Sequence, residues 1–172
     1  MNAEYEKTIN NEFDYSNVVA KPMDIAKIVQ YCDNIYNQFV MLLDEDEKRN
    51  EKLKYEFQSY NYKRCYGDGF TIYIKDKKYN SVSCKNYESF MKFIEEGKMK
   101  NLSSLEISLD LDFKRGMNDS LKSYDNSFNI VFRPYEISFI RTSNYNDESM
   151  NQIQNTINQL FSGFEVEDSI FC

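Results

Sequence analysis

The chain has 172 residues, 41% of them hydrophobic and 28% charged, a composition typical of one compact globular domain. It contains no histidine, which excludes Ser–His and Cys–His nucleophiles, histidine metal ligands and imidazole proton shuttles. Its formal net charge of −7 opposes generic binding to phosphate backbones or anionic membranes and suits contact with a basic partner protein.

The first part of the chain predicts a polar segment and then a long helix. Residues 1–20 show no stable period, and we expect a loosely packed N-terminal arm or a short irregular element there. Pro22 starts a stripe of apolar residues at three- and four-residue spacing that runs to Leu43 and predicts a helix of about 22 residues. The helix either stops near Leu43 or continues as a solvated extension, because the carboxylates of residues 44–47 are unfavourable beside the negative end of a helix.

The middle of the chain predicts strands and a short helix. Alternating apolar residues at 53–57 and at 70–74 indicate strands, and Gly67-Asp68-Gly69 indicates a turn. A reversal at residues 76–78 predicts a hairpin that ends at Cys84. Asn86 caps a short helix that ends at Gly97.

The second half of the chain contains the clearest strand, over residues 104–115, where apolar residues occupy every odd position from 105 to 113. Residues 116–127 read as a loop. The apolar positions then change phase at Pro134, which requires either two hairpin strands or one bent strand, and we favour two. A last helix is expected from residue 146 or 147 to Gly163.

These elements predict a single α+β domain over residues 1–172. Its mainly antiparallel sheet has about five to six strands, and a long N-terminal helix, a short middle helix and a C-terminal helix pack against one face. The four cysteines form no C-x-x-C pair and are expected to be reduced, so we predict no metal and no cofactor. No transmembrane segment or secretory signal is evident, and we expect a cytoplasmic location with no membrane contact.

Acidic side chains in two segments are the first candidates for partner binding. The even positions of the 104–115 strand place carboxylates on one face, about 7 Å apart for neighbours on that face. The run that follows the apolar stripe of the first helix adds four more. The predicted partner-binding residues are therefore Glu106, Asp110, Asp112, Asp44, Glu45, Asp46 and Glu47.

A basic, tyrosine-rich segment is the second candidate. Residues 52–100 carry 11 basic and 6 acidic groups, whereas both flanking segments are acidic. Aromatic residues interleaved with cations are typical of single-stranded nucleic-acid binding, although the acidic flanks oppose it. Within the segment 54–79, the residues predicted for this role are Tyr60, Tyr62, Lys63 and Arg64.

Three functions follow from these patterns. The first is a non-catalytic intracellular binding protein, an acidic inhibitor of the toxin-immunity or phage anti-defence kind that occludes a basic site on another protein. The alternative is an accessory protein that binds single-stranded nucleic acid through residues 54–79. A lesser alternative is a histidine-free enzyme that uses a divalent metal on the strand carboxylates.

Overall fold

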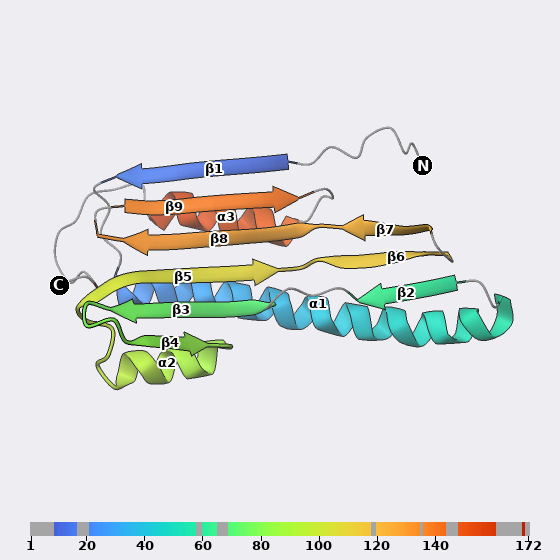
Figure 1. Cartoon of the computed structure of the whole chain (residues 1–172), viewed down its shortest axis with the longest axis horizontal. Coiled ribbons are helices and arrows are strands. Elements are labelled where there is room, and N and C mark those ends of the chain that lie inside the picture. The colour runs from blue at the N-terminus through green and yellow to red at the C-terminus, as the bar shows by residue number, and fades with distance from the viewer. Residues whose placement is uncertain are drawn as a thin grey trace.

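A six-stranded antiparallel sheet forms the centre of the fold (Figure 1). The computed structural model describes residues 9–16, 21–57, 60–64, 69–117, 120–134, 136–143, 148–160 and 170. The strands lie in the order β1 (Ile9–Ser16), β9 (Glu136–Ser143), β8 (Asn126–Arg133), β5 (Leu102–Asp110), β3 (Phe70–Asp76) and β4 (Ser81–Cys84). Together with the helices α1 (Pro22–Phe57), α2 (Tyr87–Glu95) and α3 (Glu148–Leu160), this sheet confirms the predicted α+β class.

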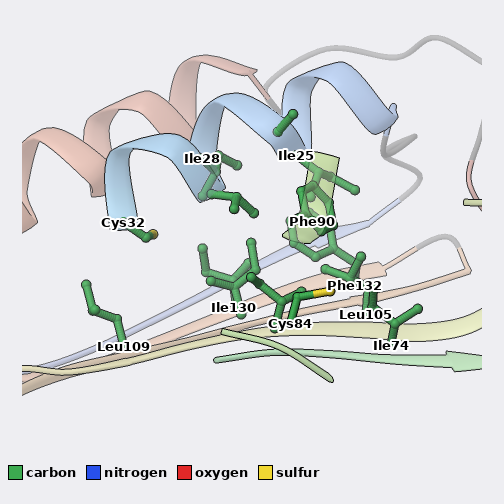
Figure 2. Close-up of a cluster of buried hydrophobic side chains, with 14 of the residues drawn as sticks. Ile25, Ile28, Cys32, Ile74, Cys84, Phe90, Leu105, Leu109, Ile130 and Phe132 are labelled. Atoms are coloured by element: carbon green, nitrogen blue, oxygen red, sulfur yellow. The ribbon is translucent and has the colours of Figure 1, made fainter. Parts of the chain in front are cut away.

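The helices cover one face of the sheet and enclose the hydrophobic core (Figure 2). Leu105, Ile107 and Leu109 of β5 are fully buried, whereas the residues between them are half-buried. Ile28 of α1 and Phe90 of α2 close the core from above. Because successive side chains of a strand point to opposite faces, the polar residues of β5 lie on the face away from the helices.

The first helix is much longer than the apolar stripe indicates. α1 has 36 residues and spans about 54 Å. Of the two alternatives for its end, the structure contains the extension, and the strand predicted at residues 53–57 is wrong. Leu53 and Phe57 are four residues apart, so they share a face of a helix as readily as a face of a strand. The extension packs against β2 (Tyr60–Arg64), a contact between elements that local periodicity does not reveal.

A second, three-stranded antiparallel sheet lies beside the far half of α1 (Figure 1). It consists of β2, β6 (Phe113–Met117) and β7 (Ser120–Tyr124). The chain leaves β5 at Asp110 and enters β6 at Phe113, so the prediction of one strand over residues 104–115 is wrong. The loop predicted over residues 116–127 is also wrong, because residues 120–124 pair with β6 in a hairpin.

Part of the segment expected to be an N-terminal arm is a strand, β1. Ile9–Ser16 pairs along its whole length with β9, which makes β1 an edge of the six-stranded sheet. The expectation of an arm or irregular element is therefore wrong for these residues, while residues 1–8 and 17–20 lie outside the described part. Main-chain hydrogen bonds hold an edge strand whatever its side chains are, so a polar sequence gives little sign of it.

The predicted reversals are largely confirmed. β8 and β9 pair up to Arg133 and Glu136, so the phase change at Pro134 is a hairpin turn. The β3–β4 hairpin pairs Lys75 with Ser81. Asn86 caps α2, its side-chain oxygen accepting from the Ser89 N–H at 2.8 Å. The first two residues of the predicted 67–69 turn lie outside the described residues.

The last helix packs on the core face through a buried arginine. Arg141 of β9 is 4% exposed, and its Nη1 donates to Asn151 Oδ1 at 2.5 Å and to Gln154 Oε1 at 3.2 Å on α3. Near the end of the chain, Ile170 is buried, and its carbonyl accepts from the Leu102 N–H at 3.2 Å.

Two further findings concern the described residues only. None of their helices is both long and apolar enough to cross a membrane. Cys32 and Cys84 are buried thiols, and burial raises the pKa of both. A buried thiol of raised pKa is a poor nucleophile and packs as a small apolar side chain, as the sequence predicts for these two.

Candidate functional site

The middle of α1 presents an apolar pair beside two carboxylates. Met41 and Leu42 are 62% and 61% exposed, and Asp44 and Glu45 are exposed one turn further along. Leu43 between them is 3% exposed and continues the core stripe. Because Leu43 is on the buried side of the helix, its neighbours on both sides turn toward solvent. We call Met41, Leu42, Asp44 and Glu45 the α1 surface.

The acidic run lies within the helix and not at its end. α1 continues to Phe57, so Asp44 and Glu45 are more than three turns from its negative end, where the helix dipole would oppose them. Each also stands four residues before a basic residue, Lys48 and Arg49 respectively, and this order of acid and base favours a helix. Asp46 and Glu47 belong to the same turn of α1, but their side chains lie outside the described part.

Glu106 and Asp110 lie on the face of β5 that points away from the helices. Both are half-buried. Glu106 stands between Tyr73 of β3 and Val131 of β8, and Asp110 stands opposite Ser127. These two carboxylates are therefore set in a flat sheet face of mixed polar and apolar residues, and are less accessible than those of the α1 surface.

Asp112 has a structural contact that its strand position did not indicate. It lies at the break between β5 and β6, and its Oδ1 accepts from the Asn126 N–H at 2.7 Å. The Leu111 N–H donates to the Asn126 carbonyl at 2.8 Å beside it. Burial raises the pKa of the Asp112 carboxyl, the Asn126 N–H opposes that shift, and the charge of Asp125 adds to it. This carboxylate thus links the break between β5 and β6, where the two sheets meet, to the start of β8.

The predicted acidic residues do not form one surface. Glu106 and Asp110 lie on the sheet face away from the helices, whereas Asp44 and Glu45 lie on a helix that covers the other face. No group of three or more cysteine, aspartate or glutamate side chains suited to a metal ion occurs among the residues that the structure describes. The metal-enzyme alternative therefore gains no support from the described residues.

The basic, tyrosine-rich segment is divided between three elements. Residues 54–57 end α1, β2 joins the second sheet, and β3 joins the first. The four residues predicted for nucleic-acid binding remain together, because Tyr60, Tyr62, Lys63 and Arg64 all belong to β2. Residues 54–79 therefore do not form one unit of the fold.

The structure adds basic residues to this group that sequence reasoning missed. Lys63 pairs with Lys114 and Tyr62 with Arg115 of β6, and Arg115 pairs in turn with Lys122 of β7. The three strands carry five basic residues and no acidic one. On the α1 side of this sheet, Phe113 stacks on Tyr124 with ring centroids 4.7 Å apart and contacts Phe39 of α1 at 5.9 Å. We call β2, β6 and β7 the basic sheet.

Met41 and Leu42 are also absent from the predicted site, although the sequence holds a signal for them. Both are large apolar residues out of phase with the stripe that ends at Leu43, so a helix through this region must expose them. Comparison of the chain with protein families, with curated proteins and with solved structures finds no match in any of the three.

Proposed function

We propose that this chain is a non-catalytic binding protein that acts inside the cell and occludes a basic site on a partner protein, as toxin-immunity and phage anti-defence proteins do. The α1 surface carries the proposal: two exposed apolar side chains stand within one turn of two exposed carboxylates. Apolar anchors bordered by charge are the usual composition of a protein-binding surface.

The support of the α1 surface suits this role. Ile25, Ile28 and Cys32 hold α1 in the core, and the helix presents the exposed residues without a cost of ordering a loop. Methionine adapts its shape to a partner, and burial of Met41 and Leu42 would supply the affinity. Asp44 and Glu45 would attract a basic partner and set its orientation, mainly through the association rate.

The test begins with capture of the partner and continues with the purified pair. Tagged protein is used to isolate a partner from its host lysate at low salt, and the partner is identified and purified. We expect a partner with a basic surface, and Met41→Ser with Leu42→Ser should weaken binding by about tenfold or more. Asp44→Lys with Glu45→Lys should slow association and reduce its salt dependence.

A matched control distinguishes an effect of the α1 surface on binding from an effect of the net charge of the protein. Glu88→Lys with Glu95→Lys makes the same change in net charge on the exposed face of α2. This control should bind nearly as the wild type does. Equal loss in both charge-reversed variants, or unchanged affinity in the Met41 and Leu42 variant, would refute the proposal.

The basic sheet supports a second candidate function, binding of single-stranded nucleic acid. The observation that favours it is the register, which sets Lys63 opposite Lys114 in a sheet whose three strands carry no acidic residue. Such binding is electrostatic and weakens steeply with salt, while tyrosines stack on bases.

Fluorescence anisotropy with a labelled oligonucleotide at low salt tests the second candidate. Lys63→Gln with Arg64→Gln should weaken binding and reduce its salt slope by about 1.4. Lys75→Gln with Lys92→Gln, both exposed and outside the basic sheet, is the charge-matched control. Absence of binding by the wild type at low salt would eliminate this function.

A further inference from the structure

The tip of the β3–β4 hairpin, the end of α2 and the start of β5 meet on the left of Figure 1. Side chains from these segments line a cavity of about 220 Å³. Four apolar residues line it: Ile74 and Leu102 are buried, Phe93 is half-buried, and Val82 is 44% exposed. The other lining residues are polar or charged: Asp76, Asn80, Lys98 and Lys100. An apolar cavity of about 150 Å³ accommodates a benzene ring, so this one has room for a single ring or a branched aliphatic group.

The walls of this cavity are held in place by the hairpin. Asp76 Oδ1 accepts from the N–H groups of Lys78 and Asn80 at 2.8 and 2.9 Å, and Oδ2 accepts from Asn80 Nδ2 at 2.8 Å. The Lys77 N–H donates to the carbonyl of Asn101, which ties the hairpin to the segment before β5. The cavity is therefore formed before any ligand enters, which reduces the cost of binding.

The mouth of the cavity favours an anion. Lys98 and Lys100 line it, and Lys100 makes no ion pair within the described part of the chain. Lys98 Nζ lies 2.6 Å from Glu96 Oε2, with both side chains more than half exposed, so solvent screens this pair and an incoming carboxylate can compete for the ammonium. Asp76 also lines the cavity and stays ionised, because the hydrogen bonds from Asn80 and Lys78 lower its pKa, but the two lysines outnumber it.

We propose that this cavity binds an apolar group that carries a carboxylate, with the apolar part between Phe93, Val82 and Leu102 and the carboxylate at Lys100. Two sources supply this chemistry: a small free acid, or the C-terminal residue of a peptide. The site is separate from the α1 surface and from the basic sheet, so it does not depend on either proposed function.

The test is an NMR titration of the full chain with 4-methylpentanoate and, as a matched neutral probe, 4-methylpentan-1-ol. We expect the acid to shift the methyl signals of Ile74, Val82 and Leu102. Lys100→Gln should weaken binding of the acid by about threefold and leave the alcohol unchanged. Lys27→Gln, an exposed lysine of α1, is the control and should change neither. Val82→Phe should fill the cavity and abolish both.

A peptide arm distinguishes the two sources. Acetyl-Gly-Gly-Leu is compared as free acid and as C-terminal amide. Tighter binding of the peptide acid than of 4-methylpentanoate assigns the site to a chain end, and weaker binding assigns it to a small acid. The proposal is overturned if 4-methylpentanoate shifts none of the three methyl signals up to its solubility limit, or if amide and acid bind equally. Equal affinity of the acid for wild type and Lys100→Gln would also overturn it.

Discussion

Replacing Asp112 tests how the two sheets are joined. The side chain has two separable properties: an oxygen that accepts from the Asn126 N–H at 2.7 Å, and a charge that burial disfavours. Asp112→Asn keeps an acceptor oxygen and removes the charge, whereas Asp112→Ala removes both. Since Asn126 is 0% exposed, water does not easily replace the lost acceptor.

The expected magnitude follows from these contacts. A buried N–H left without its acceptor costs about 1–3 kcal/mol, so Asp112→Ala should be less stable than Asp112→Asn by that amount. For a domain of this size, each kcal/mol lowers Tm by about 2–4 °C. Urea denaturation monitored by circular dichroism measures the free energies of unfolding of the three proteins.

The pH dependence has a definite sign. The pKa of Asp112 is raised in the folded chain, so the folded state binds its proton more tightly than the unfolded chain does. The stability that this proton contributes is present below the ordinary aspartate pKa of about 3.9 and is lost as pH rises through the raised folded pKa. The stability of Asp112→Asn relative to wild type should therefore increase from pH 4 to pH 7.

A neighbouring variant provides the control. The charge of Asp125 contributes to the raised pKa, so Asp125→Asn should reduce the pH-dependent difference without removing it. The reasoning is refuted if Asp112→Ala and Asp112→Asn are equally stable, or if the stability difference between Asp112→Asn and wild type does not change with pH.

Three further substitutions have expected outcomes in the same denaturation assay. Tyr79 is 95% exposed with φ +67°, so Tyr79→Asn should stabilise the chain by about 1 kcal/mol, and a loss of stability would contradict this. Gly69 has φ +64°, and an added Cβ would lie 2.7 Å from the Tyr36 hydroxyl oxygen, so Gly69→Ala should destabilise by at least about 1 kcal/mol, less so in a Tyr36→Leu background. Phe90 is fully buried, and Phe90→Ala should cost about 3–5 kcal/mol; a cost below 1 kcal/mol would show that α2 is not part of the core.

Local sequence patterns predicted those elements whose apolar residues lie on one face and whose ends carry strong turn or capping residues. The β3–β4 hairpin, α2 with its Asn86 cap, and the β8–β9 hairpin at Pro134 were all recognisable. The break after Asp110 was not, because an extended chain keeps its alternation of side chains while it passes from one sheet into the next.

Edges and extensions also escaped prediction. β1 is polar and is placed by main-chain hydrogen bonds to β9, which leave no side-chain period. Residues 53–57 fit both periods, and in the structure they continue α1, a helix that contacts β2. The predicted acidic residues differ in their surroundings. Asp44 and Glu45 are exposed, whereas Asp112 accepts a hydrogen bond from the Asn126 N–H at the break between β5 and β6, which the sequence does not show.

The sequence by itself determined that the chain has no imidazole chemistry, that its net charge is −7, and that one stripe of α1 and positions 105, 107 and 109 of β5 are apolar. These properties depend on composition and on spacing within a few residues. Only the tertiary structure decided that acidic Glu106 and Asp44 lie on different sides of the sheet and that Lys63 is aligned with Lys114. Strand partners are separated by tens of residues, and their register depends on main-chain pairing and core burial across the whole fold. The charge is therefore not uniform: the three strands of the basic sheet carry five basic residues and no acidic one, whereas Asp44 and Glu45 are exposed on α1.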